Sequence, residues 1–243
     1  MTRTLVVLFA SLLAHTTLAE QRPRVAIIID DLGYEWTAAE RLLALDLPMT
    51  FAILPDAPKA RRLAEAAQRF GQEVIVHLPL QAMSDKGSHG SNEITLDMNA
   101  AQFRRAFDRA LRSVPFAVGV NGHRGSLVTQ HPGHMQWLMD SIRCSANLFF
   151  VDSYTTHLSV AMQIADESGI PAVKRDVFLD NSREPADIRR EIDRLKALAR
   201  ESGSAVAIGH PYPETLALLE QALPALQAEG FDLVHVSELV RVN

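Results

Sequence analysis

The chain has little cysteine, few aromatic residues and no excess of positive charge, and each shortage excludes something. Its one cysteine, Cys144, cannot form an internal disulfide, so the fold does not depend on one; we expect this residue to be buried as a small apolar group. Aromatic residues make up 6% of the chain, which argues against a broad stacking platform for carbohydrate. The formal net charge is -5, with lysine and arginine spread along the chain, so no nucleic-acid partner is expected.

The apolar run at the N-terminus is shorter than the roughly 20 residues that a membrane span requires. It extends from Leu5 to Ala14, follows a cation at Arg3, and precedes a short polar stretch that ends in TLA. This layout is typical of a secretory signal peptide and predicts one over residues 1–19, with cleavage after Ala19. The alternative is a retained N-terminal anchor. We expect an exported, periplasmic protein with no integral membrane span after cleavage.

No linker rich in glycine, serine or proline interrupts the rest of the chain, which predicts one domain over residues 23–243. Short apolar runs alternate with stretches of helical periodicity, a pattern typical of βαβ units around a mainly parallel sheet. The expected strands lie within residues 24–30, 47–55, 72–80, 116–122, 148–153, 169–180, 204–211 and 231–237. The clearest expected helices lie within residues 36–45, 57–70, 99–114 and 184–202. Residues 81–99 are expected to form a long loop.

Polar side chains follow almost every expected strand. In chain order they are Asp30, Asp31, His77, His123, Asp152, Ser153, Arg175, Asp176, Asp180 and His210. The carboxyl ends of parallel strands meet on one face, where α/β folds place ligands and catalytic groups, so we expect these side chains to gather there. One carboxylate with two imidazoles matches the ligands of a hydrolytic metal site. A second carboxylate beside the metal can take a proton from the attacking water.

Each of these residues, taken alone, also has an ordinary structural explanation. Either aspartate of the first strand could cap the following helix, and the histidines of the third and fourth strands could be hydrogen-bonded core residues. His210 could close the turn before Pro211, and Arg175 could be an ion-pair partner of Asp180. Their concentration at one end of the sheet favours a functional site.

Several of these strand ends lie in segments that match a known family in order. The segments are VAIIIDDLGY, EVIVHLPL, GVNGHRGS, FFVDSYTT, KRDVFLDN and AIGHPYPETL. Together they resemble the divergent polysaccharide deacetylase family, over about residues 24–240. The resemblance implies a NodB-like α/β fold, an irregular (β/α) barrel of about seven parallel strands.

The resemblance also implies a metal centre with a neighbouring base. Asp30 would be the catalytic base, and Asp31, His77 and His123 would bind one divalent metal ion, usually zinc. Ordinary polysaccharide deacetylases carry both metal histidines in one HxxxH segment. Here Gln81 stands four residues after His77, so the second imidazole has to come from His123, as it does in the divergent branch.

A second group of implied roles concerns proton donation and substrate contact. His210 would protonate the leaving amine, with Asp176 orienting its ring and Asp180 as the second choice for that partner. The branch usually reads NNHMGS where this chain has NGHRGS, so Gly122 removes an amide and Arg124 adds a cation beside the metal. The residues expected to contact substrate are Arg124, Asp152, Ser153, Arg175 and Asp180.

The implied function is metal-dependent hydrolysis of N-linked or O-linked acetyl groups on an envelope carbohydrate. The substrate would be an acetylated polysaccharide or a peptidoglycan-like glycan. Two alternatives stay open: a non-catalytic glycan-binding or envelope-regulating protein on the same fold, and a different metallohydrolase, such as a phosphoesterase or an amidase. A binding protein does not need a base and an acid, and a phosphoesterase would usually hold two metal ions with more carboxylates. The complete set of residues favours the deacetylase.

Overall fold

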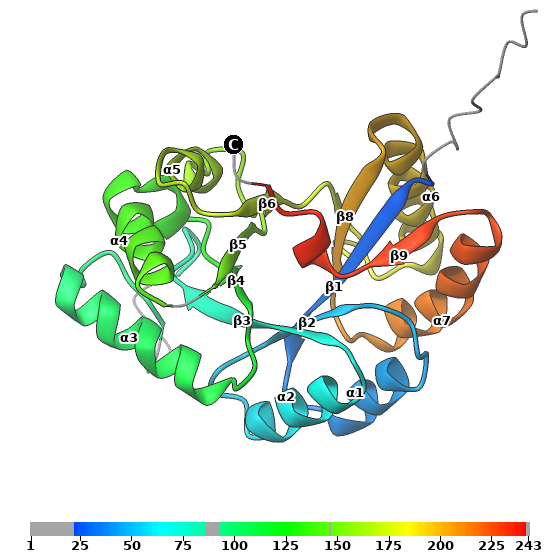
Figure 1. The fold of residues 1–243 in the computed structure, drawn as a ribbon, viewed down its shortest axis with the longest axis horizontal. Helices are drawn as coiled ribbons and strands as arrows, with labels where there is room; N and C mark the ends of the chain where they lie inside the picture. Colours follow the sequence, from blue (N-terminus) through cyan, green and yellow to red (C-terminus); the bar gives the residue numbers. More distant parts are fainter. Residues whose placement is uncertain (1–21, 86–92, 146, 242–243) are drawn as a thin grey trace, which may run out of the picture.

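A computed structural model describes residues 22–85, 93–145 and 147–241 of the chain. Within them, one curved sheet carries helices around its outer side (Figure 1). The strands are β1 (Arg24–Leu32), β2 (Thr50–Ile53), β3 (Glu73–Leu80), β4 (Gly119–Arg124), β5 (Phe149–Asp152), β6 (Ala172–Lys174), β7 (Val177–Phe178), β8 (Ser204–Gly209) and β9 (Asp232–Val234). The helices are α1 (Trp36–Leu43), α2 (Ala60–Arg69), α3 (Ala100–Ser113), α4 (Pro132–Arg143), α5 (Ala161–Glu167), α6 (Pro185–Ser202) and α7 (Pro213–Ala228), with short 3₁₀ turns η1 (Val128–Gln130) and η2 (Val236–Glu238). The predicted signal peptide of residues 1–19 lies outside the described residues.

The strands of the sheet run parallel wherever they pair, as the alternation of strands and helices predicted. Their order is β6-β5-β4-β3-β2-β1-β8-β7, and β9 lies beside the first residues of β1. All the carboxyl ends of these strands therefore lie on one face of the molecule. This arrangement confirms the predicted α/β architecture.

The strand expected within residues 169–180 is divided into two. One part, β6, pairs with β5 at one edge of the sheet, and the other part, β7, pairs with β8 at the opposite edge. Arg175 and Asp176 alone separate the two strands in the sequence. Among the described strands no ladder joins β6 to β7, so at this point the covalent chain, rather than strand pairing, connects the two edges.

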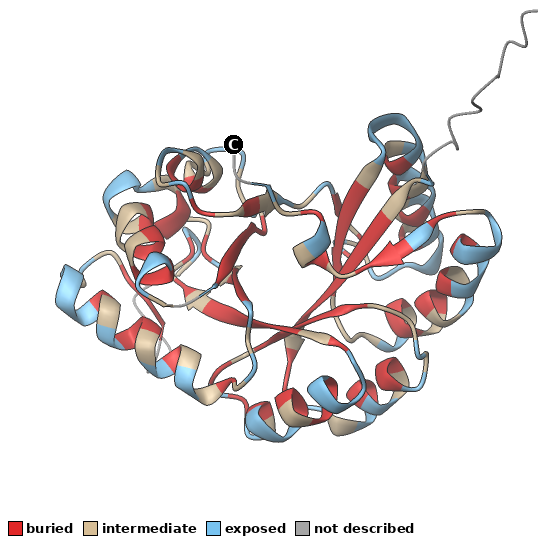
Figure 2. Ribbon diagram, in the orientation of Figure 1, coloured by how far each residue is buried: buried red, intermediate tan, exposed pale blue. Residues whose placement is uncertain are grey.

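Alternation along the strands separates two apolar layers. Ile27, Ile29 and their equivalents on other strands pack against the helices, in the larger core. Ile28, Ile75 and Ile208 belong to a smaller core on the other face of the sheet, inside the curve. Both layers are buried, and the helices turn their buried faces toward the sheet (Figure 2). Because side chains alternate, a polar residue two positions after one of these inner residues also points into the curve.

The four predicted helices are confirmed as α1, α2, α3 and α6. The described parts of residues 81–99 form the predicted loop, in which an isolated bridge joins Leu80 to Ile94. The prediction that Cys144 is buried is wrong, because this residue ends α4 on the solvent side and is exposed. Among the described residues, none of the helices combines the length and apolarity needed to cross a bilayer.

Candidate active site

Asp30 and Asp31 both reach the inner face of the sheet because β1 is irregular at this point. The register of β1 against β2 shifts between Ile29 and Leu32, so the two aspartates stand opposite one residue, Ala52. Asp30 keeps the inward direction of the regular strand. Asp31 would point outward, but its φ of 57° lies in the left-handed region and redirects the chain. Aspartate tolerates that conformation better than most residues, which explains how two adjacent carboxylates can serve one pocket.

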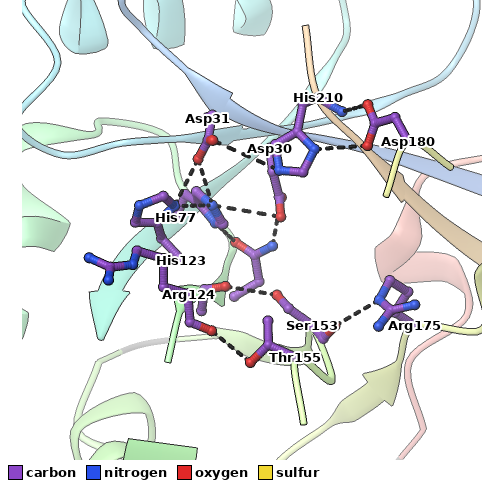
Figure 3. A network of polar contacts seen from close by, with 12 residues as sticks. Asp30, Asp31, His77, His123, Arg124, Ser153, Thr155, Arg175, Asp180 and His210 are labelled. Atoms are coloured by element: carbon purple, nitrogen blue, oxygen red, sulfur yellow. Dashed lines mark hydrogen bonds and ion pairs between the residues drawn. The ribbon is translucent and has the colours of Figure 1, made fainter. Parts of the chain in front are cut away.

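Asp31, His77 and His123 form a group that could hold a metal ion (Figure 3). Their ligand atoms lie within 4.8 Å of one another. Oδ1 of Asp31 is 3.1 Å from Nε2 of His77 and 2.8 Å from Nδ1 of His123, and the two nitrogens are 3.2 Å apart. This oxygen is buried, yet no described residue gives it a hydrogen bond of acceptable geometry. A buried acceptor that converges on two imidazole nitrogens without an aligned donor fits a cation between them, and the donor set suits zinc.

Asn121 connects the metal group to the other aspartate. It is fully buried on β4 and, two residues before His123, points to the same face. Its Oδ1 lies 2.8 Å from Nδ1 of His77, and its Nδ2 donates to Oδ1 of Asp30 at 2.8 Å. Because Asn121 Oδ1 can only accept, Nδ1 of His77 donates in the first contact, and the lone pair of Nε2 is left facing Asp31 and His123. Asn121 was not predicted as a site residue, although counting back two positions from His123 identifies it.

His210 is held by a second set of contacts, from β7, β8 and the start of α7. Its Nδ1 is 2.9 Å from Oδ1 of Asp180, and its main-chain N–H donates to Oδ2 of Asp180 at 2.6 Å. The Thr215 hydroxyl donates to the same Oδ2 at 2.8 Å. Burial would lower the pKa of His210, but Asp180 outweighs it and the pKa is raised. Nε2 of the ring is thereby turned toward the metal group, 3.8 Å from Oδ2 of Asp31.

The prediction that Asp176 orients His210 is wrong, and the second choice, Asp180, takes this position. Asp176 is exposed and precedes β7, and its Oδ2 accepts a hydrogen bond from the main chain of Val206 at 2.8 Å. Asp180 follows β7, at the carboxyl end where His210 lies. The two aspartates are four residues apart, so alternation along a strand cannot distinguish them; the pairing of β7 with β8 does.

Burial and mutual charge interactions shift the pKa values of Asp30, Asp31 and His77, and the two aspartates shift in opposite directions. Burial would raise the pKa of Asp31, but its contacts with His123 and His77 outweigh burial and hold the pKa well below its ordinary range. Burial raises the pKa of Asp30, although His77 opposes the shift. Burial would lower the pKa of His77, but the two aspartates outweigh it and the pKa is raised. The group therefore attracts positive charge, and protons and a metal ion would compete for it.

Arg124 lies beside the metal group but is neutralised by the loop that follows β3. Its guanidinium pairs with Asp85 and lies 3.6 Å from Glu93, and both acidic side chains are almost completely buried. Arg124 has a φ of 62°, a second non-glycine residue in the left-handed region at this face. With His123 it lines a cavity of about 190 Å³. Contact between Arg124 and substrate stays a prediction, and this cavity is where it would occur.

Asp152 and Ser153 hold the loop after β5. Oδ1 of Asp152 accepts from the main chain of Tyr154 at 2.8 Å, and Oδ2 accepts from the Ser159 hydroxyl at 2.9 Å. Burial raises the pKa of Asp152, although these donors oppose it. The Ser153 hydroxyl donates to the carbonyl of Gly122 at 2.9 Å. Substrate contact by either side chain stays a prediction. In the structure both side chains fix the path of the loop after β5.

Arg175 also holds the loop after β5, by hydrogen bonds to its main chain (Figure 3). Its Nε donates to the carbonyl of Ser153 at 2.7 Å and one Nη donates to that of Tyr154 at 2.9 Å. The described contacts of Asp180 are with His210 and Thr215, not with Arg175. The ion pair considered from the sequence is thus replaced by main-chain contacts. Predicted substrate binding by Arg175 and Asp180 stays a prediction.

The chain belongs to the divergent polysaccharide deacetylase family, whose model matches residues 27–240. The YibQ protein of Escherichia coli is 38% identical over 235 residues, which are 97% of this chain and 72% of that protein. A protein of Haemophilus influenzae is 37% identical over 232 residues, covering 93% of this chain and 80% of that one. The resemblance inferred from the six motifs is confirmed.

Solved structures share the fold. Protein ATU2773 of Agrobacterium tumefaciens superposes with a TM-score of 0.85 at 24% identity, covering 91% of each chain. A family 4 carbohydrate esterase from Streptomyces lividans, solved in complex with acetate, gives 0.52 at 16% identity over 91% of this chain and 97% of that one. A CE4-family pseudoenzyme from Bacillus anthracis gives 0.54 at 15% identity, over 90% and 65%. The NodB-like fold is therefore confirmed, and since it carries both an esterase and a pseudoenzyme, activity has to be argued from the site.

Proposed function

We propose that this protein is a metal-dependent hydrolase that removes N-linked or O-linked acetyl groups from an envelope carbohydrate. The observation that carries the proposal is the convergence of five side chains from β1, β3, β4 and the end of β8: Asp30, Asp31, His77, His123 and His210. We also propose that residues 1–19 direct export to the periplasm, where such a carbohydrate is accessible.

Asp30 is the proposed general base. Its Oδ2 lies 3.6 Å from Nε2 of His77, at the edge of the metal group, while Asn121 holds its other oxygen. A divalent ion held by Asp31, His77 and His123 would polarise the acetyl carbonyl and lower the pKa of a bound water toward about 7. Asp30 would accept the proton of the attacking water at Oδ2, since Oδ1 is already engaged.

His210 is the proposed general acid. Asp180 binds its Nδ1, so the other ring nitrogen carries the proton that is given to the departing amine or alcohol. Nε2 lies 3.8 Å from Oδ2 of Asp31, whereas the nitrogens of His77 and His123 are close to Oδ1 of the same carboxylate. In this proposal, base and acid act on the reacting acetyl group from different directions, as attack and departure require. The products would be acetate and a free amino or hydroxyl group on the sugar.

A non-catalytic glycan-binding protein on the same fold is the second candidate function. The Bacillus anthracis pseudoenzyme has this fold, and one mutant of it is described as having restored enzymatic activity. Substitutions can therefore separate an inactive from an active protein on this scaffold. The hydrogen-bonded pair of His210 and Asp180 favours the enzyme, because binding a glycan does not require a positioned acid.

The test combines metal analysis with acetate release. The exported form should bind one divalent ion per chain and release acetate from peptidoglycan fragments or chito-oligosaccharides, and removal of the ion with a chelator should abolish release. Restoring the ion should restore activity. Bound metal without acetate release from any acetylated glycan would favour the glycan-binding alternative. A protein that binds no divalent ion would contradict the proposed mechanism.

A further inference from the structure

A second cavity adjoins the proposed acid. It has a volume of about 540 Å³ and is lined by the loop after β5, by β7 and by the first turns of α6. Phe178 forms part of its wall, and the centroid of that ring lies 5.3 Å from the centroid of the His210 ring. The volume is within the range of small-ligand sites. A substrate group on the His210 side of the reacting bond would therefore face this cavity.

Arg175 is the least exposed of the arginines that line this cavity. It is half-buried and stacks over Phe178, with 4.9 Å between the guanidinium carbon and the ring centroid. Its contacts in the described part of the chain are the carbonyls of Ser153 and Tyr154, and no carboxylate lies within ion-pair distance. Burial lowers the pKa of Arg175, and Arg194 adds to this shift, while the more distant carboxylates of Asp152, Asp30 and Asp176 oppose it without forming an ion pair. A desolvated guanidinium beside another cation is suited to bind an anion.

The helix α6 adds two more arginines and two carboxylates to the lining. Arg190 is 2.6 Å from Asp187, and Arg194 is 3.3 Å from Glu191. These arginines are largely exposed, so each pair is weak and a ligand can compete for its arginine. With Arg175 included, three cations face two anions, and one positive charge remains in excess. That excess matches a single carboxylate better than a doubly charged phosphate.

We propose that this cavity is a subsite for a carboxylate carried by the acetylated glycan, so that the preferred substrate is an anionic sugar chain. The inference rests on the proposed function in one respect: the sugar that carries the departing amine lies on the His210 side of the reacting bond. A carboxylate on that sugar or its neighbour then reaches Arg175 and the two arginines of α6.

The test uses two acetamido oligosaccharides that differ in one group. One carries a carboxylate, and the other is the same molecule with the carboxylate reduced to the alcohol. A charge-assisted contact predicts that kcat/KM favours the carboxylated form by about tenfold or more. Arg194→Gln should bring this preference close to one. Arg200→Gln is the matched control, because Arg200 loses the same charge on the same helix, pairs with Glu229 outside the cavity lining, and should keep the preference.

Calorimetric binding of the same two oligosaccharides separates failure of the subsite from failure of the proposed hydrolase. Equal affinities, or a preference that Arg194→Gln leaves intact, would overturn the subsite. Tighter binding of a phosphorylated oligosaccharide than of the carboxylated one would overturn the assignment to a carboxylate. A binding preference that disappears in Arg194→Gln, without acetate release from either molecule, would support the subsite and contradict the hydrolase.

Discussion

The metal group (Asp31, His77 and His123) and the proposed proton-donor pair (His210 and Asp180) lie next to each other, yet their polar atoms are satisfied in different ways. Around Asp31 two imidazole nitrogens lie within 3.1 Å of one buried oxygen, but no aligned donor among the described residues satisfies it. Around Asp180, by contrast, the carboxylate accepts hydrogen bonds from the His210 ring, a main-chain N–H and a hydroxyl. The first group has the donors to hold a cation, and the second is satisfied by protein groups alone. Substitutions in the first should therefore change ion binding, while those in the second should change the rate and leave ion binding intact.

The largest effect is expected for Asp31→Ala. It removes the carboxylate that both imidazoles face, so metal content should fall to background and hydrolysis with it. The stabilisation linked to the ion, about 2.7 kcal/mol at a free concentration 100 times Kd, should also be lost. Metal analysis and thermal unfolding with and without added ion measure both changes. An unchanged metal content would remove Asp31 from the ligand set.

Asp30→Asn should separate the two aspartates. The amide keeps an oxygen that can accept from Asn121, so the fold and the metal group should persist. Loss of a positioned general base typically lowers the rate by about 10² to 10⁴. We expect full metal content, a melting temperature close to that of the parent, and little acetate release. If this variant loses the metal while Asp31→Ala keeps it, the roles of the two carboxylates are reversed.

Asp180→Asn should lower kcat without lowering metal content. The substitution replaces one acceptor oxygen with an amide donor, so it disturbs the contacts to His210 and Thr215 and leaves the ring poorly oriented. We expect a rate loss of about 10², at the lower end of general acid catalysis, and a stability loss of about 1–3 kcal/mol from unsatisfied buried groups.

Asp176→Asn is the matched control for this variant. Asp176 is exposed, and its amide oxygen can still accept from Val206, so both rate and stability should stay near the parent values. Equal rate losses in the two variants would mean that the contact between Asp180 and His210 does not orient the acid.

The sequence was informative where strands are long and regular. In β3 and β4, and at the residue that follows β8, the alternation of inner and outer side chains directs His77, His123 and His210 inward, so these proposed site residues could be predicted as a group. The same alternation would have identified Asn121, which was not predicted as a site residue. Helices α1, α2, α3 and α6 followed equally directly from their apolar periodicity.

Alternation alone is insufficient where local geometry departs from the regular strand. Asp31 was expected at this site from its position at a strand end, but it points inward only because of the register shift and its left-handed φ, which no periodicity reveals. The partner of His210 was misassigned because β7 has two residues, too few for its ends to be located from an apolar pattern. The sequence left open an ion pair between Arg175 and Asp180, whereas Arg175 binds carbonyls of a loop whose path depends on the whole sheet. These positions are determined by tertiary contacts.

Apart from the control substitutions, Asn121→Ala is expected to have the smallest effect, and it tests whether Asn121 couples Asp30 to His77. The change removes the acceptor for Nδ1 of His77 and the donor to Asp30. Loss of a residue that orients a metal ligand typically weakens metal affinity by about 10-fold to 100-fold, so metal titration should show a weaker site that saturates at higher concentration.

Asn121→Asp separates the contact with His77 from the contact with Asp30. It keeps an acceptor for His77 but places a second carboxylate against Asp30, so metal affinity should recover while hydrolysis at saturating metal stays low. Recovery of both properties would mean that the contact with Asp30 is dispensable. If neither metal affinity nor hydrolysis recovers in Asn121→Asp, Asn121 acts through packing alone.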